Sequence, residues 1–116
     1  MDTPETISPD VINPLTLSRA VTDAYRNVSL SKVNDHEIRM SVMTSQFPWH
    51  RHPDSDETFH CIDGDLVIEL ADREVVVRPG EFFTVPSGAL HRTRPAGERS
   101  VNLTFERAGA ATIFEE

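Results

Sequence analysis

The chain has 116 residues and a formal net charge of −8, and 38% of its residues are hydrophobic and 26% charged. This length allows one hydrophobic core, and the composition excludes wholesale disorder. An acidic surface repels phosphate groups, so we expect no binding to nucleic acid or to anionic membrane surfaces.

The sequence also limits the compartment in which the protein functions. No stretch approaches 18 apolar residues, so we expect no membrane span. The first residues lack the basic and apolar regions of a signal peptide. The single cysteine, Cys61, excludes an internal disulfide and suits a reducing compartment. We therefore expect a cytoplasmic protein.

The first 26 residues predict an arm followed by a short helix. Residues 1–14 contain three prolines among small polar residues, which predicts an extended or mobile arm. Residues 15–116 are then expected to form a single domain. Within residues 16–26, apolar side chains recur at the spacing of one helical face, which predicts one short amphipathic helix.

The rest of the chain has the pattern of short β-strands. Val28–Val33 and Ile38–Val42 flank the turn pair Asn34-Asp35, which predicts a hairpin. Beyond residue 47, apolar or alternating runs are separated by turn residues, and this rhythm predicts an all-β sandwich or barrel. The tail after Glu106 is interpreted as either a last strand or a loose end. Further strands are expected at residues 58–63, 65–70, 74–78, 81–85, 89–94 and 101–106.

Three histidines and a glutamate are spaced so that they can face one point. His50 and His52 are two residues apart, and such side chains point to the same face of a strand. After a loop, Glu57 opens the next strand, and His91 begins another strand after the turn at residues 86–88. Imidazole and carboxylate groups suit Fe, Mn, Ni and Zn. We predict that His50, His52, Glu57 and His91 bind one divalent metal ion.

These residues resemble the two sequence motifs of the cupin superfamily. The matching positions are His50, His52, Glu57 and Gly64 in the first motif and Gly80, Pro86, Gly88 and His91 in the second. One position departs from the pattern, because Pro95 stands where the motif usually ends in asparagine, which affects a local turn and not a ligand. The resemblance implies a small cupin, a jelly-roll-like barrel in which the three histidines and the glutamate hold the metal inside. With the helix expected within residues 16–26, the predicted fold is an all-β jelly-roll-like barrel with one short N-terminal helix.

Other residues have simpler interpretations. His60 is out of phase with Glu57 and is expected to face away from the site, whereas Cys61 is in phase and is expected to be a small buried residue. Thr93 and Asn102 are expected to line the cavity. The aromatic residues expected to pack, one or two of them in the pocket wall, are Phe47, Trp49, Phe59 and Phe83. The residues interpreted as solvated charges are Asp54, Asp56, Arg92 and Arg94.

The predicted site supports several functions. Three neutral imidazoles and one carboxylate leave a divalent ion with a local charge of about +1 and, if it is six-coordinate, with open positions. This predicts a metal-dependent enzyme acting on a small organic molecule, either a dioxygenase or an isomerase or lyase. A cupin that binds or senses a small ligand without turnover is one alternative, and a closed structural zinc site is another. No acid or base beside the ligands is evident, so no catalytic residue is predicted.

The sequence also predicts self-association. Small single-domain barrels leave apolar sheet faces and edges that need cover. The apolar strands Val28–Val33 and Ile38–Val42 lie outside the motif core. We expect a homodimer in which these strands contact the partner, with the arm of residues 1–14 as a further candidate contact.

Overall fold

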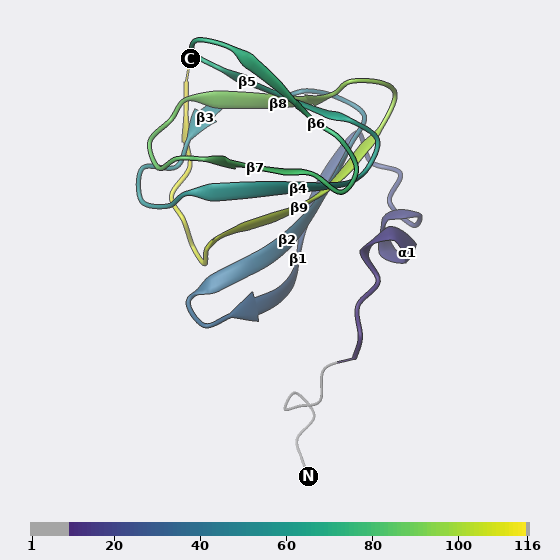
Figure 1. Cartoon of the computed structure of the whole chain (residues 1–116). Coiled ribbons are helices and arrows are strands. Elements are labelled where there is room, and N and C mark those ends of the chain that lie inside the picture. The colour runs from purple at the N-terminus through teal and green to yellow at the C-terminus, as the bar shows by residue number, and fades with distance from the viewer. Residues whose placement is uncertain (1–9, 116) are drawn as a thin grey trace.

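A computed structural model describes residues 10–115 as ten strands and one short helix (Figure 1). The elements in chain order are α1 (Pro14–Ser18), β1 (Tyr25–Val33), β2 (His36–Met43), β3 (Phe47–Arg51), β4 (Glu57–Asp63), β5 (Leu66–Leu70), β6 (Glu74–Val77), β7 (Phe82–Val85), β8 (His91–Pro95), β9 (Ser100–Arg107) and β10 (Ile113–Phe114). None of the helices in this described part is long and apolar enough to cross a membrane.

The strands form two antiparallel five-stranded sheets. Their orders are β1-β2-β9-β4-β7 in the first sheet and β10-β3-β8-β5-β6 in the second. Strands adjacent in the sequence often lie in different sheets, so the chain crosses repeatedly between the two layers, as in a jelly roll. The predicted all-β jelly-roll barrel with one short N-terminal helix is confirmed.

A hydrophobic core joins the two sheets. Phe59 and Cys61 of β4 pack with Leu66 and Ile68 of β5, and Cys61 is fully buried as predicted. Side chains alternate across each strand, so every second residue reaches this core. At about 25 cal/mol per Å² of apolar surface, this burial stabilises the barrel without any contribution from a metal.

The predicted N-terminal hairpin is confirmed, but its apolar residues face outward. The turn lies at Asn34, whose positive φ of 56° is tolerated by asparagine. Met40 and Val42 of β2 belong to a second apolar cluster, with Val101 of β9 and the partly buried Val21. This cluster covers the outer side of the first sheet. The polar residues between them on β2 therefore point inward, toward the second sheet.

The N-terminal helix is shorter than predicted. It spans Pro14–Ser18 instead of residues 16–26, and the side chain of Asn13 caps it by accepting from the N–H of Thr16 at 3.2 Å. Beyond the helix, the apolar residues do not share one face. Val21 packs against the cluster outside the first sheet, and Tyr25 is the first residue of β1. Of the predicted arm, residues 1–9 lie outside the described residues, and Pro14 opens the helix instead.

The remaining strand predictions are confirmed to within a few residues. Each of the six segments expected beyond residue 47 contains a strand of the structure. The tail forms a last short strand, because Ile113 and Phe114 of β10 pair with β3. Figure 1 shows this C-terminal segment in yellow, alongside the strand that carries His50. The end of the chain is thereby placed next to the predicted site.

Candidate metal centre

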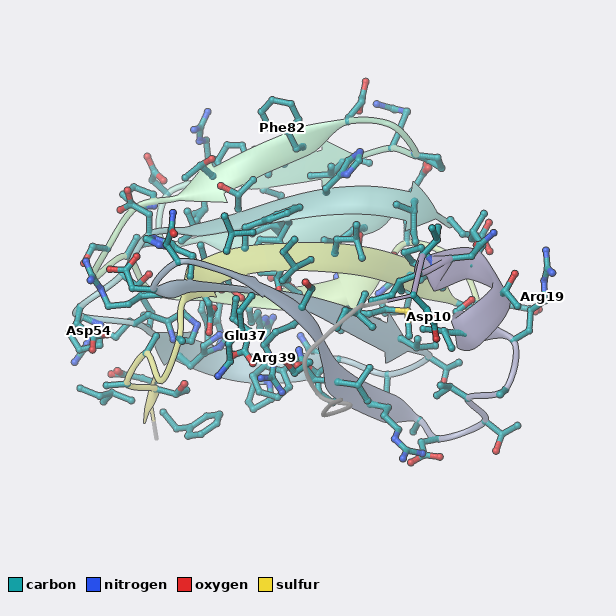
Figure 2. The ribbon with its side chains drawn as sticks, turned by 90° about the horizontal axis from the view of Figure 1, so that it is seen from below. Asp10, Arg19, Glu37, Arg39, Asp54 and Phe82 are labelled. Carbon is teal, nitrogen blue, oxygen red and sulfur yellow. The ribbon has the colours of Figure 1, made fainter. Side chains whose placement is uncertain are left out.

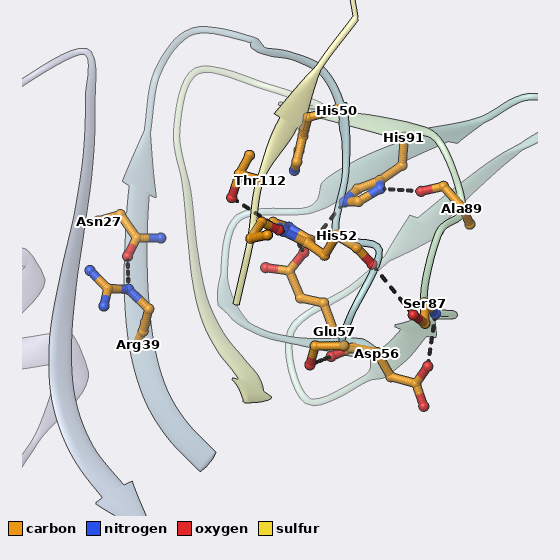
Figure 3. A network of polar contacts seen from close by, with 12 residues as sticks. Asn27, Arg39, His50, His52, Asp56, Glu57, Ser87, Ala89, His91 and Thr112 are labelled. Carbon is orange, nitrogen blue, oxygen red and sulfur yellow. Dashed lines mark hydrogen bonds and ion pairs between the residues drawn. The ribbon is translucent and has the colours of Figure 1, made fainter. Parts of the chain in front are cut away.

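The four predicted ligands come together between the two sheets. His50 lies on β3 opposite His91 of β8, His52 lies just past the end of β3, and Glu57 is the first residue of β4. All four are buried, and one ligand atom from each lies within 4.8 Å of the others (Figure 3). Ligands at about 2.1 Å from one ion are at most about 4.2 Å apart. The observed spacing thus needs only small side-chain adjustments to hold one ion.

The three imidazoles share the same hydrogen-bonding arrangement. In each ring, Nδ1 lies at hydrogen-bond distance from a backbone carbonyl oxygen, which favours a proton on Nδ1 and leaves the Nε2 lone pair for a metal. The three pairs are His50 with Pro48 (2.8 Å), His52 with Ala111 (3.0 Å) and His91 with Ala89 (2.9 Å). Such outer contacts orient metal ligands and fix their tautomers.

The inner nitrogen atoms gather around the Glu57 carboxylate. Glu57 Oε1 lies 3.1 Å from His52 Nε2 and 3.3 Å from His91 Nε2. The contact with His52 is close but not aligned as a hydrogen bond, so His52 Nε2 is a buried nitrogen without a hydrogen-bond partner among the described residues. Buried polar atoms rarely lack a partner. The donor set therefore fits a divalent cation, and metal binding itself stays a prediction.

The protonation of these groups depends on their surroundings. Burial lowers the pKa of His50 to about 4, which keeps this ring neutral and ready to bind a metal. Burial also disfavours the charged forms of His52 and Glu57, but the attraction between these two side chains outweighs this effect. The contact with Glu57 raises the pKa of His52 to about 9, while contacts with His52 and His91 lower the pKa of Glu57 to about 2. Without a metal, His52 and Glu57 are therefore an ion pair at pH 7.

Metal binding is expected to release a proton from His52. Because its pKa of about 9 must be overcome before Nε2 can bind, the apparent metal affinity should rise by about tenfold per pH unit from pH 7.5 to 9 and then level off. Competition against a chelator across this range, with calorimetry in buffers of different ionisation enthalpy, measures the slope and the proton. An affinity independent of pH over this interval would contradict the prediction.

The C-terminal segment holds His52 in place. The Asp54 carboxylate accepts from the N–H of Ala111 at 3.1 Å, and the carbonyl oxygen of Ala111 contacts His52 Nδ1. The N–H of Arg107 donates to the Ser55 hydroxyl at 2.9 Å. Asp54 is exposed, as expected of a solvated charge, but it also ties the tail to the loop between the first two histidines and Glu57. This contact of Asp54 could not be predicted from the sequence, because no local pattern indicates that the C-terminal tail returns to this loop.

The candidate centre opens onto a cavity of about 340 Å³. His50, His52 and Glu57 line it, and the predicted Thr93 does as well. The predicted Asn102 is fully buried and does not line the cavity. Of the four aromatic residues, Phe47 and Phe59 form part of the cavity wall, whereas Phe83 packs against the core. Trp49 stacks under the guanidinium group of Arg92, whose Cζ lies 4.8 Å from the ring centroid.

Several cavity residues were not predicted from the sequence. Tyr25 and Asn27 come from β1, Arg39 from β2 and Glu106 from β9, all outside the recognised motifs. Burial and the neighbouring Glu57 carboxylate raise the pKa of Glu106 to about 7. An acid–base group therefore stands beside the ligands. The polar and apolar residues of β2 alternate, but this pattern does not show which of the two faces lines the cavity.

The other predictions concern residues outside the centre. His60 lies on β4 against Phe82 of β7, with ring centroids 6.4 Å apart, and it is not among the cavity residues. Arg92 and Arg94, interpreted as solvated charges, both donate to Glu69, at 2.9 and 3.3 Å. These pairs are partly exposed, so they contribute little to stability.

Comparisons with known proteins agree with this architecture. The cupin domain family matches residues 36–105, more than half of the chain. The uncharacterized protein YdbB of Bacillus subtilis is 40% identical over 105 residues, which cover 90% of this chain and 92% of that protein. Quercetin 2,3-dioxygenase of the same organism is 33% identical over 45 residues, 39% of this chain and 13% of that enzyme.

Solved structures have the same fold. A cupin-2 domain containing protein from Shewanella frigidimarina superposes with a TM-score of 0.77 and 26% identity, covering 84% of this chain and 94% of that chain. The two sheets, the buried histidine and glutamate cluster and the match over residues 36–105 lead to one assignment. The chain belongs to the cupin family.

Proposed function

We propose that this chain is a metal-dependent enzyme that acts on a small organic molecule. The observation that carries the proposal is the position of the candidate ligands, since His50, His52 and Glu57 line a cavity of about 340 Å³ instead of a closed site. Cavities of this size are at the lower end of small-molecule sites. A divalent ion bound here would supply Lewis-acid or oxygen chemistry.

Groups of this chain would supply the rest of the site. Phe47 and Phe59 offer apolar walls that exclude water, and Thr93 adds a hydroxyl. Glu106 lines the same cavity and provides the carboxyl that proton transfer to or from a bound molecule requires. A base beside the metal ligands favours an enzyme over a cupin that only binds or senses a ligand. We leave two reaction classes open, a dioxygenase and an isomerase or lyase.

Metal analysis followed by an activity screen tests this proposal. Protein purified without added metal should contain one divalent ion per chain, of Fe, Mn, Ni or Zn. It should then convert one or more small carbonyl or catechol-like compounds, and oxygen uptake would identify a dioxygenase. Glu106→Gln should slow turnover at unchanged metal content. A fully loaded protein that binds such compounds and converts none would favour the binding or sensing alternative, whereas an ion inaccessible to any added ligand would favour the structural zinc site.

We also propose that the chain forms a homodimer in the reducing cytoplasm, through the outer side of the sheet that contains the predicted contact strands Val28–Val33 and Ile38–Val42. On the outer side of the first sheet, Phe82, His60, Leu103 and Met40 occupy neighbouring register positions on four strands. Met40 is already covered by this chain, but Phe82 is 71% exposed and points outward (Figure 2). An exposed aromatic side chain at the end of a row that also contains Leu103 and Met40 suits a self-complementary interface.

Sedimentation tests the homodimer. The wild-type protein should sediment as a dimer at about tens of micromolar, the range in which standard interfaces hold. Phe82→Glu should shift it toward the monomer because it places a charge in the interface. Val76→Glu, which changes a 42% exposed residue of the other sheet, is the matched control. A wild-type species of 13.0 kDa alone would contradict the proposal.

A further inference from the structure

The cavity has a second polar region, away from the three histidines. Tyr25 and Asn27 of β1, Arg39 of β2 and Thr104 of β9 all line it. Figure 3 shows Asn27 and Arg39 on strands separated from the histidine cluster, and Figure 2 shows Arg39 beside Glu37. A molecule in the cavity can therefore meet the candidate metal at one end and these side chains at the other.

Arg39 is held in a fixed orientation with hydrogen-bond donors to spare. Its Nε donates to Asn27 Oδ1 and its Nη1 donates to Glu37 Oε1 at 3.1 Å. A guanidinium group has five N–H donors. Within the described residues, Nη2 of Arg39 has no partner, and its side chain is 31% exposed. Among the described residues that line the cavity, Arg39 is the one lysine or arginine.

Thr104 adds a second unpaired group at the same place. It lies opposite Arg39 in the register of β2 and β9, and partners in such a pair have neighbouring side chains. Thr104 is 2% exposed, and its Oγ1 is buried without a hydrogen-bond partner among the described residues. A buried hydroxyl of this kind costs stability unless a ligand satisfies it. Arg39 and Thr104 together thus offer donors for ligand oxygen atoms.

The charges of the cavity limit what this region accepts. Glu37 is already engaged, because Oε1 accepts from Arg39 and Oε2 accepts from the Ser29 hydroxyl. Glu106 and Glu57 also line the cavity, so a ligand with several negative charges would be repelled. One carboxylate, matched to the single guanidinium group, is the group that fits both the donors and the charge.

We propose that Arg39 and Thr104 bind the carboxylate of a small monocarboxylic acid whose other end, a hydroxyl or carbonyl oxygen, meets the metal. This inference rests on the proposed function, because it needs a metal at the four-residue cluster. Through this contact, Arg39 determines which substrates bind. If Arg39 only stabilises the fold through Glu37, the carboxylate makes no difference to binding.

A series of two-ended ligands tests the inference on the Zn²⁺-loaded protein. Acetohydroxamate measures metal access alone. The monohydroxamates of malonic, succinic, glutaric and adipic acid carry a carboxylate at increasing distance, and each is compared with the amide that replaces this carboxylate. At the chain length that reaches Arg39, the acid should bind at least about tenfold more tightly than its amide, as expected for a charged hydrogen bond.

The acid-to-amide ratio is then measured in variants. It should fall to about one in Arg39→Gln and by a few-fold in Thr104→Val, which keeps the shape but removes the hydroxyl. Arg26→Gln is the matched control, since Arg26 lies on β1, is 52% exposed and does not line the cavity. If Arg39→Gln fails to fold, Arg39→Lys replaces it, and the ratio should still fall because the planar fork is lost.

The outcomes separate the two proposals. A ratio near one at every chain length, with acetohydroxamate bound, overturns the carboxylate inference and leaves the proposed function intact. A ratio that persists in Arg39→Gln, or in Arg39→Lys where that variant replaces it, also overturns the inference, because another group would then bind the acid. Failure of acetohydroxamate to bind the loaded protein overturns the proposed function and, with it, the two-ended ligand. A ratio of about tenfold that depends on Arg39 and not on Arg26 supports the inference.

Discussion

His91→Ala is expected to abolish metal binding while the barrel stays folded. His91 is fully buried, its Nδ1 lies at hydrogen-bond distance from the Ala89 carbonyl oxygen, and its Nε2 faces Glu57. It is the ligand supplied by β8, so its loss opens the ring of ligands on one side. Replacing a residue that hydrogen-bonds to a metal ligand typically lowers metal affinity by about 10–100-fold, so losing a ligand itself should lower it by more than about 100-fold.

The fold should survive because the apolar core does not include the metal ligands. The inter-sheet cluster contains Leu66, Ile68 and Val85, each at most 1% exposed, and it is continuous across both sheets. Removing a buried ring leaves a cavity that costs about 2–5 kcal/mol, which lowers the melting temperature without unfolding a stable domain. This differs from a zinc finger, in which the metal supplies the folding free energy.

A thermal melt combined with metal analysis of the purified variant measures both effects. His60→Ala is the matched control, because His60 lies on the outer side of β4 and should leave metal binding unchanged. A folded His91→Ala variant with full metal stoichiometry and affinity would show that His91 is not a ligand. An unfolded variant would favour the structural zinc site over the enzyme.

Gly64→Ala is expected to be the most destabilising conservative change in the turns. Gly64 has a φ of +73°, and a Cβ at this position would lie 2.0 Å from the carbonyl oxygen of Arg99. Its own carbonyl oxygen accepts from the hydroxyl of Ser100 at 2.7 Å and from the thiol of Cys61. Backbone must therefore move in a tightly bonded turn. We expect a loss of about 2–5 kcal/mol in the free energy of unfolding.

Gly80→Ala separates the two causes of this loss. Gly80 has a φ of +90°, but a Cβ there would meet no atom of residues 10–115 within 4 Å. It should therefore cost only the backbone strain, about 1–2 kcal/mol. Chemical denaturation of both variants measures the difference. Equal losses would show that the close approach of Gly64 to Arg99 does not contribute.

The strands and the ligand cluster could be predicted because their signals are local. His50 and His52 lie two residues apart around the end of one strand, and the turns at Gly64 and Gly80 set the register of the next strands, β5 and β7. A shift of one residue in the register of a strand would turn its side chains to the other face, so the alternating pattern strongly constrains which residues face the core. The convergence of the two histidines with Glu57 and His91 results from this constraint.

The helix was predicted too long because spacing does not identify the surface that a residue covers. Leu17, Val21 and Tyr25 have helical spacing, but Leu17 is 46% exposed, Val21 covers the outer face of the first sheet and Tyr25 stacks on Phe47. Each side chain is thus placed by a different tertiary contact. Tertiary packing overrides a short helical pattern.

The polar wall of the cavity was missed for a related reason. Along β2 the apolar Met40 and Val42 alternate with the polar Arg39 and Ser41, and the pattern alone does not say which face meets the core. Here the apolar face is covered from outside and the polar face lines the cavity. Only the position of β2 next to β9 reveals this arrangement.

A crystal structure of the metal-loaded protein, with anomalous diffraction recorded at the absorption edge of the metal, tests the central claim most directly. We predict one ion about 2.0–2.2 Å from the Nε2 atoms of His50, His52 and His91 and from the Glu57 carboxylate. Each Nδ1 should keep its contact with a backbone carbonyl oxygen. An ion bound elsewhere, no ion at saturating metal, or any one of the four side chains turned away from the ion would contradict the assignment.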